Sequence, residues 1–258
     1  MEELKTEFNF KTDGFVVIHD IINKEILKAA QKSVYYLAQL RYKNEFENSI
    51  EIKDRENLDK IILELENLNP HHKGFIYDTL PFLPELQLFF HNDPVLTYVR
   101  KTLSVDFFSY VSMINLNIRI DLPGRNWKHN KPWHQDYPYQ NPLYAKGSSL
   151  VAWSPLFDCP LECGPVILKP GSHVLGEVST IPIPREPGQS PEWTMDQKYL
   201  DDSAFEDFQI PINAGDLVLF DMNLIHKSGI NLSENKIRWS VTTRFSDVSS
   251  PEFLKKYL

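Results

Sequence analysis

The sequence predicts a β-sandwich or β-barrel with helices packed outside it. Between about residue 20 and residue 105, apolar side chains recur at helical spacing. After about Tyr110 the pattern changes to short alternating runs separated by Pro, Gly and Asn, which is typical of all-β domains. The 258 residues, 42% of them hydrophobic, suffice for one large domain or two small ones. We expect a single domain over 1–258, with a helical part at about 20–105 and a barrel at about 106–247.

The N-terminal part begins with a short apolar strand and continues in helices. Asn23 is a candidate N-cap, because its side chain can accept a hydrogen bond from the first turn of the next helix. Pro94 interrupts the last helical stretch, since proline lacks the amide proton that a helix interior needs. In chain order, we expect a strand at 15–18, a helix from Asn23 to about Leu40, a helix at roughly 56–67, and further helix between Pro81 and Leu103.

The C-terminal part contains the candidate strands of the barrel. Between them, the segment 179–200 is rich in Pro, Glu and Ser, and is a candidate for a long functional loop. Together with the charged insert at 44–69, this segment could cover the entrance to a site. The expected strands are 112–120, 149–157, 164–168, 208–212, 216–225 and 237–245.

Charge and composition narrow the partners and the compartment. The net charge of −8 argues against nucleic acid or an anionic membrane as the main partner, because both attract excess Lys and Arg. No stretch approaches the roughly 18 apolar residues that span a bilayer, and the acidic start does not resemble a secretory signal. The two cysteines, Cys159 and Cys163, lie close together in a turn, which favours a reduced, cytoplasmic setting.

The sequence Trp133-His134-Gln135-Asp136 is the first candidate for a metal site. In an extended segment, residues two apart point to the same side, so His134 and Asp136 can face one cation. A similar pair, His91-Asn-Asp93, lies in a helical region directly before a proline. On a helix its two side chains would diverge, so we interpret this second pair as a helix cap or turn.

His226 is the candidate for a third metal ligand. The dipeptide Gly215-Asp216 predicts a turn, and the apolar run after it predicts a buried strand that ends near His226. A single histidine in such a place can equally be a hydrogen-bonded core residue, and this alternative stays open on the strand alone.

The last strand, 237–245, alternates cleanly between two faces. Ile237, Trp239, Val241, Thr243 and Phe245 share one face, and Arg238, Ser240, Thr242 and Arg244 share the other. A regular face with two arginines suits the wall of a cavity that receives an anion, because guanidinium binds carboxylate through two hydrogen bonds. A solvated strand face is the alternative for both arginines.

These residues belong to a longer series of motifs in a fixed order. The series comprises His134-Gln-Asp136, Gly164-Pro-Val-Ile-Leu-Lys-Pro-Gly-Ser-His173, Ala214-Gly-Asp216, His226-Lys-Ser-Gly-Ile-Asn231 and Arg238, preceded by Gly14-Phe-Val-Val-Ile18. In order and spacing, it resembles the phytanoyl-CoA dioxygenase family over about residues 110–246. The resemblance implies a double-stranded β-helix, a jelly-roll or cupin-like barrel flanked by the N-terminal helices.

The resemblance also implies a cofactor set. It implies that His134, Asp136 and His226 hold Fe(II), and that Arg238 binds the distal carboxylate of the co-substrate 2-oxoglutarate. Two histidines and a carboxylate leave metal positions open for 2-oxoglutarate and O2, as in other non-haem iron oxygenases. By position, the further co-substrate contacts would be Ser228, Trp153, Asn117 and Gln135.

The implied reaction is hydroxylation of a small-molecule metabolite, with release of succinate and carbon dioxide. Halogenating relatives lack the carboxylate ligand, so Asp136 favours hydroxylation. A second anion on the substrate could be bound by arginines if they face inward. The candidate substrate residues are Arg119, Trp133, Tyr137, Tyr139 and Arg244.

Two other classes of function remain open. One is a ligand-binding barrel without catalysis, which the intact ligand positions and Arg238 disfavour. The other is a non-oxidative metalloenzyme, such as a zinc or manganese hydrolase, at the same three residues. A carboxylate base would be expected beside such a metal, and the sequence contains no obvious one at a reliable spacing.

Overall fold

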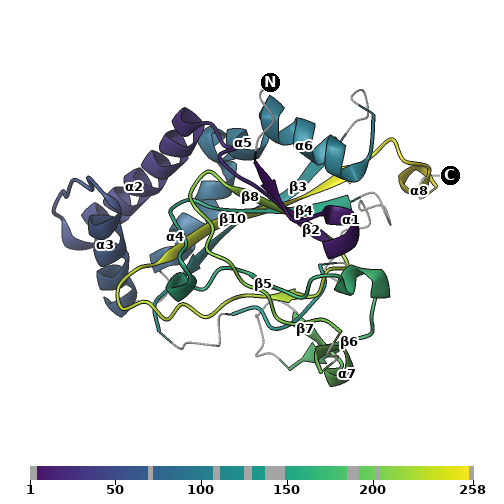
Figure 1. Ribbon diagram of the computed structural model, residues 1–258. Coiled ribbons are helices and arrows are strands. Elements are labelled where there is room, and N and C mark those ends of the chain that lie inside the picture. The colour runs from purple at the N-terminus through teal and green to yellow at the C-terminus, as the bar shows by residue number, and fades with distance from the viewer. Residues whose placement is uncertain are drawn as a thin grey trace.

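A computed structural model describes residues 5–68, 72–106, 111–124, 130–136, 149–184, 192–201 and 204–255. Its centre is a six-stranded antiparallel sheet in the order β1-β2-β8-β4-β10-β3 (Figure 1). These strands are β1 Thr6–Glu7, β2 Phe15–Ile18, β3 Val111–Asp121, β4 Ser149–Pro155, β8 Leu217–Asp221 and β10 Arg238–Asp247. Two smaller antiparallel pairs are β5 Ile167–Leu168 with β9 His226–Lys227, and β6 Thr180–Ile183 with β7 Glu192–Met195.

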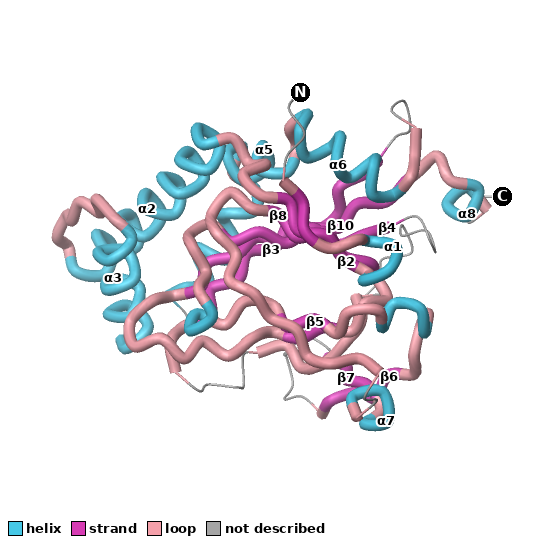
Figure 2. The backbone as a smooth tube through the Cα atoms, in the orientation of Figure 1, coloured by secondary structure: helices cyan, strands magenta, loops and turns pink. Residues whose placement is uncertain are grey.

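The larger helices and the smaller sheets lie on opposite sides of the large sheet (Figures 1 and 2). The N-terminal helices are α1 Phe10–Asp13, α2 Lys24–Phe46, α3 Arg55–Leu68, α4 His72–Thr79, α5 Pro84–Phe90 and α6 Asp93–Leu103, and the later ones are α7 Gln197–Leu200 and α8 Pro251–Leu254. Short 3-10 turns are η1 Leu80–Phe82, η4 Leu161–Cys163 and η5 Ser172–Leu175. Within the part of the chain that is described, no helix is both long and apolar enough to cross a membrane.

The first long helix begins where the sequence predicts and ends later. The Asn23 side chain accepts a hydrogen bond from the amide of Glu25 at 2.8 Å, as expected of an N-cap. The helix continues beyond Leu40 because Tyr42 and Phe46, one turn apart, both pack on the core and against each other, with ring centroids 4.4 Å apart.

The second His-x-Asp pair, His91-Asn-Asp93, lies at the start of a helix. Asn92 is the N-cap of α6, and its side chain accepts a hydrogen bond from the amide of Val95 at 3.2 Å. Pro94 lies in the first turn, where its missing amide proton is not needed. The interpretation of this motif as a helix cap is therefore confirmed, and the cap is Asn92.

One apolar core joins the N-terminal helices to the outer face of the sheet. Ile237, Trp239, Val241 and Phe245 all lie in it, as the alternation of the last strand predicts. Asp59 of α3 is also buried here, and its carboxylate accepts hydrogen bonds from the Trp239 indole at 3.0 Å and from the Ile237 amide at 3.1 Å. This carboxylate ties the helical part to β10.

Three expectations for the C-terminal part are wrong. The strand expected at 216–225 ends at Asp221, and His226 lies in the separate strand β9. The segment 208–212 forms no strand and makes only isolated bridges, Phe208 with Leu168 and Ile212 with Cys159. The described parts of 179–200 form the β6–β7 hairpin and α7, not a structureless loop. Met195 at the end of this hairpin is buried, and an apolar contact of this kind stabilises a hairpin against the rest of the fold.

Candidate active site

Three buried polar side chains converge between the large sheet and the β5–β9 pair. His134 and His226 are joined by two main-chain hydrogen bonds, of 2.9 and 3.0 Å, so two distant segments lie side by side. Nε2 of His134 lies 3.6 Å from Oδ1 of Asp136, and Nε2 of His226 lies 3.9 Å from the same oxygen. One ligand atom from each residue falls within 4.8 Å of the others. The predicted trio is therefore brought together.

Both imidazoles present a lone pair to the centre of the trio. Nδ1 of His134 lies 2.7 Å from the Pro132 carbonyl, and Nδ1 of His226 lies 2.9 Å from the Leu224 carbonyl. A carbonyl only accepts, so each Nδ1 carries the proton and each Nε2 presents a lone pair that can bind a metal. Burial, together with the neighbouring His134, lowers the pKa of His226 to about 3, so this ring is neutral at physiological pH.

Asp136 is ionised, and Arg244 binds it on the side away from the two histidines. Nε and Nη2 of Arg244 donate to Oδ2 of Asp136 at 2.9 and 2.5 Å. Burial alone would raise the pKa of this carboxyl, but the Arg244 guanidinium holds it well below its ordinary value. Two imidazoles and one carboxylate form a donor set that fits a divalent transition metal.

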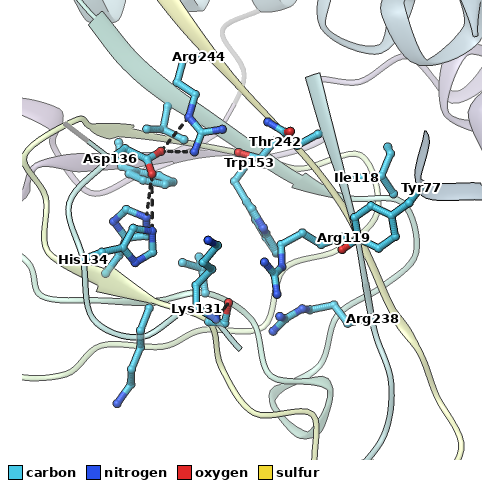
Figure 3. A pocket seen from close by; sticks show the side chains of 17 residues that line it. Tyr77, Ile118, Arg119, Lys131, His134, Asp136, Trp153, Arg238, Thr242 and Arg244 are labelled. Atoms are coloured by element: carbon cyan, nitrogen blue, oxygen red, sulfur yellow. Dashed lines mark hydrogen bonds and ion pairs between the residues drawn. The ribbon is translucent and has the colours of Figure 1, made fainter. Parts of the chain in front are cut away.

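A cavity of about 480 Å³ extends from these three residues along the inner face of the large sheet. Part of its wall consists of side chains from neighbouring strands in register. Asn117, Thr242 and Trp153 form one row across β3, β10 and β4, and Arg244, Val151 and Phe220 form the next row across β10, β4 and β8. Figure 3 shows the metal-binding candidates at one end and a second polar group at the other.

The far end of the cavity contains two arginines that share one carboxylate. Asp121 is opposite Arg238 in the pairing of β3 with β10, and its Oδ2 lies 2.7 Å from Nη2 of Arg238. Nη2 of Arg119 donates to Oδ1 of the same residue at 2.8 Å. Burial would raise the pKa of Asp121, but Arg238 and Arg119 lower it to about 2. Two guanidinium groups against one carboxylate leave a net positive charge, which suits an anionic ligand.

Close packing of glycine at this end also positions Arg238. Nη1 of Arg238 donates to the Gly229 carbonyl at 3.0 Å. A Cβ at Gly229 would lie 2.2 Å from the Pro165 carbonyl oxygen, so no side chain fits here. The close approach of these two loops therefore sets the acceptor that Arg238 uses.

The other predicted co-substrate contacts fall into two groups. Ser228, Trp153 and Asn117 line the cavity, and the Ser228 hydroxyl accepts a hydrogen bond from the Lys131 amide at 3.2 Å. Gln135 does not line it, because its side chain is fully buried and bound to backbone groups of Gly176, Asn223 and Val178. The prediction of a co-substrate contact for Gln135 is therefore wrong.

Of the predicted substrate residues, some face the cavity and others do not. Trp133 packs beneath the ammonium groups of Lys227 and Lys169, which lie 4.2 and 5.1 Å from its ring centroid, and its side chain is not part of the described cavity wall. Arg119 and Arg244 do face the cavity, but each already binds a carboxylate. Tyr137 and Tyr139 lie outside the described residues.

Some cavity residues carry no signal in the sequence. Tyr77 of α4 reaches the wall beside Arg119, and its hydroxyl accepts a hydrogen bond from the Ile120 amide at 3.3 Å. Lys131 and Lys227 also line the cavity. Among the described wall residues, none comes from 44–68.

A comparison with protein families identifies the chain. The family model for phytanoyl-CoA dioxygenase (PhyH) matches residues 10–239, which is most of the sequence. The chain belongs to the phytanoyl-CoA dioxygenase family. A search of curated protein sequences gave no match.

Solved structures with the same fold are distant in sequence. The epimerase SnoN in complex with Fe3+, alpha ketoglutarate and nogalamycin RO has a TM-score of 0.58 at 17% identity, covering 93% of this chain and 81% of SnoN. AviO1 from Streptomyces viridochromogenes Tue57 has a TM-score of 0.58 at 16% identity, with 94% and 93% covered. EvdO2 from Micromonospora carbonacea var. aurantiaca, complexed with 2-oxoglutarate, has a TM-score of 0.54 at 18% identity, with 98% and 97% covered. At this identity the likeness shows a shared fold.

Proposed function

We propose that this PhyH-family chain is an Fe(II)- and 2-oxoglutarate-dependent oxygenase that hydroxylates a small-molecule metabolite. The observation that carries the proposal is the convergence of His134, Asp136 and His226 at one end of a cavity whose other end carries paired arginines. The same proposal takes the chain as one domain with the double-stranded β-helix fold. The large sheet and the β5–β9 pair, on two sides of the cavity, support that fold.

His134, Asp136 and His226 would hold the iron, through Nε2, Oδ1 and Nε2. The lone pairs of the two imidazoles and the ionised carboxylate support this assignment. When bound, iron with 2-oxoglutarate and O2 supplies the oxidation, and succinate and carbon dioxide are released. The protein's part is to orient the reactants and to exclude water, which the burial of all three ligands favours.

Arg238 would bind the distal carboxylate of 2-oxoglutarate. Its buried guanidinium is held by Asp121 and Gly229 and borders the cavity, so it is preorganised for a further anion. Ser228 would donate its hydroxyl proton to the same carboxylate, while the flat ring of Trp153 and the amide of Asn117 would line the bound co-substrate. Tyr77 and Arg119 border this end as well.

Hydroxylation is proposed as the outcome, and two others are tested beside it. SnoN is named as an epimerase, and SnoK, of the same fold, as a carbocyclase, so this fold hosts several outcomes. The mass of the product separates them: hydroxylation adds one oxygen atom, epimerisation leaves the mass unchanged, and ring closure removes two hydrogen atoms. A screen of candidate metabolites for substrate-dependent succinate release, followed by product mass, identifies both substrate and outcome.

The proposal as a whole is tested without knowing the substrate. Anaerobic addition of Fe(II) and then 2-oxoglutarate should produce a visible metal-to-ligand charge-transfer band, and admission of air should convert 2-oxoglutarate slowly to succinate. His226→Ala should abolish both, because it removes one of three metal ligands. A charge-transfer band without succinate would favour a ligand-binding barrel. Turnover of a substrate that persists without oxygen would favour a non-oxidative metalloenzyme.

A further inference from the structure

The two oxygens of the Asp136 carboxylate have different neighbours. Oδ1 faces Nε2 of His134 and Nε2 of His226, at 3.6 and 3.9 Å. Oδ2 accepts two hydrogen bonds from the opposite side, from Nε and Nη2 of Arg244 (Figure 3). The arginine thus engages the oxygen that points away from the histidines and leaves the other oxygen toward them.

The residues around Asp136 leave its carboxylate only one freedom, which the contact with Arg244 restricts. Asp136 is 3% exposed, and its amide donates to the Met222 carbonyl at 3.1 Å, so its main chain is fixed. The remaining freedom is rotation of the carboxylate, which could present one oxygen or both to a cation. Arg244 comes from β10, where it pairs with Val151 of β4, so the sheet fixes the main chain from which the guanidinium reaches Asp136.

We infer that Arg244 is a positioning residue, which orients Asp136 so that Oδ1 alone is presented to the metal. The inference rests on the proposed metal site. It replaces the expectation that Arg244 binds an anion of the substrate, because the Nε and Nη2 edge of its guanidinium is already filled by a buried carboxylate. A substrate anion would have to displace Asp136 from that edge.

Positioning and simple electrostatics predict opposite effects on metal affinity. A guanidinium close to a cation repels it, so removal of its charge should strengthen metal binding if charge alone matters. If Arg244 positions the ligand, its removal should weaken metal binding despite the lost repulsion. Partners that orient metal ligands typically contribute about 10–100-fold in affinity.

The experiment measures Mn(II) affinity of the full-length protein from the loss of the free-ion electron paramagnetic resonance signal, without turnover. Arg244→Gln should bind Mn(II) about 10–100-fold more weakly than wild type. Arg244→Lys, which keeps the charge but has no planar pair of donors, should also bind more weakly. In the Co(II)-loaded protein, the visible absorption bands of Arg244→Gln should shift, because a freed carboxylate changes the coordination.

Lys227→Gln is the matched control. Lys227 lines the same cavity and carries the same charge, but its ammonium packs over the Trp133 ring and faces Asp207, not Asp136. Its removal should leave Mn(II) affinity unchanged or slightly increased. Circular dichroism of the metal-free proteins checks that each variant is folded. If Arg244→Gln does not fold, the Mn(II) affinity of Arg244→Lys decides the test.

The outcomes separate this inference from the proposed function. If wild type binds no Mn(II) at a site that His226→Ala removes, the metal site itself is wrong. If wild type binds Mn(II) and Arg244→Gln and Arg244→Lys bind it as well as Lys227→Gln does, the site stands and the positioning role of Arg244 is overturned.

Discussion

Nη2 of Arg238 lies 2.7 Å from Oδ2 of Asp121, and the two residues are direct partners across β10 and β3. The two residues are 3% and 6% exposed, and Arg238 borders the end of the cavity away from the histidines. A guanidinium anchored in this way needs little reorganisation to receive a second carboxylate. The pair therefore links the architecture of the sheet to the proposed co-substrate site.

Arg238→Ala should raise the KM for 2-oxoglutarate by roughly 30-fold or more. Loss of one partner of a buried charged contact costs about 2 kcal/mol or more, and this charge would contact the co-substrate directly. The measurement is uncoupled succinate release over a range of 2-oxoglutarate concentrations. An unchanged KM would show that another group anchors the co-substrate.

Arg119→Met tests whether the second arginine contributes to binding of 2-oxoglutarate or of the substrate. Since Arg119 shares Asp121 with Arg238, we expect its loss to raise the KM for 2-oxoglutarate more than the KM for the substrate, once a substrate is known. We expect a smaller effect than for Arg238→Ala. A rise in the substrate KM alone would restore Arg119 to the substrate site, as the sequence suggested.

The Asp121 carboxylate should make stability depend on acid pH. Its folded pKa of about 2 lies below the ordinary 3.8, so it stabilises the fold above pH 4, and this contribution is lost as the pH falls toward 2. The expected loss is about 2 kcal/mol in the free energy of unfolding. Carbon-13 NMR titration of Asp121 measures the pKa directly. In Arg119→Gln the pKa should rise, and titration of wild type near 3.8 would contradict the prediction.

Asp59→Ala should lower the free energy of unfolding by about 3 kcal/mol. The substitution leaves the indole N–H of Trp239 and the amide of Ile237 without the buried acceptor that they share. Urea denaturation measures the change. Lys60→Ala, on an exposed position of the same helix, is the control and should change stability by less than about 0.5 kcal/mol. Equal effects in both variants would mean that the contact does not stabilise the fold.

Much of the fold could be predicted because it depends on local pattern. Asn23 caps one helix and Pro94 lies in the first turn of another, for reasons that lie within a few residues of each. The pattern at 208–212 predicted a strand that does not form. Its apolar residues pack on the core, but its main chain makes only isolated bridges and no continuous ladder. The helix end near Phe46 was missed, since a tertiary contact extends it beyond the local signal.

For the site, the sequence by itself determined which residues of one extended segment point to the same side of it. His134 and Asp136 share one because extended backbone has a period of two, and β10 presents its arginines to the cavity for the same reason. Only the tertiary structure decided what each of these side chains meets. By local pattern Arg238 and Arg244 are equivalent, but strand register pairs the first with Asp121, and the packing of one layer on another pairs the second with Asp136. Register and layer packing join residues far apart in the chain, and a local pattern carries no information about such distances.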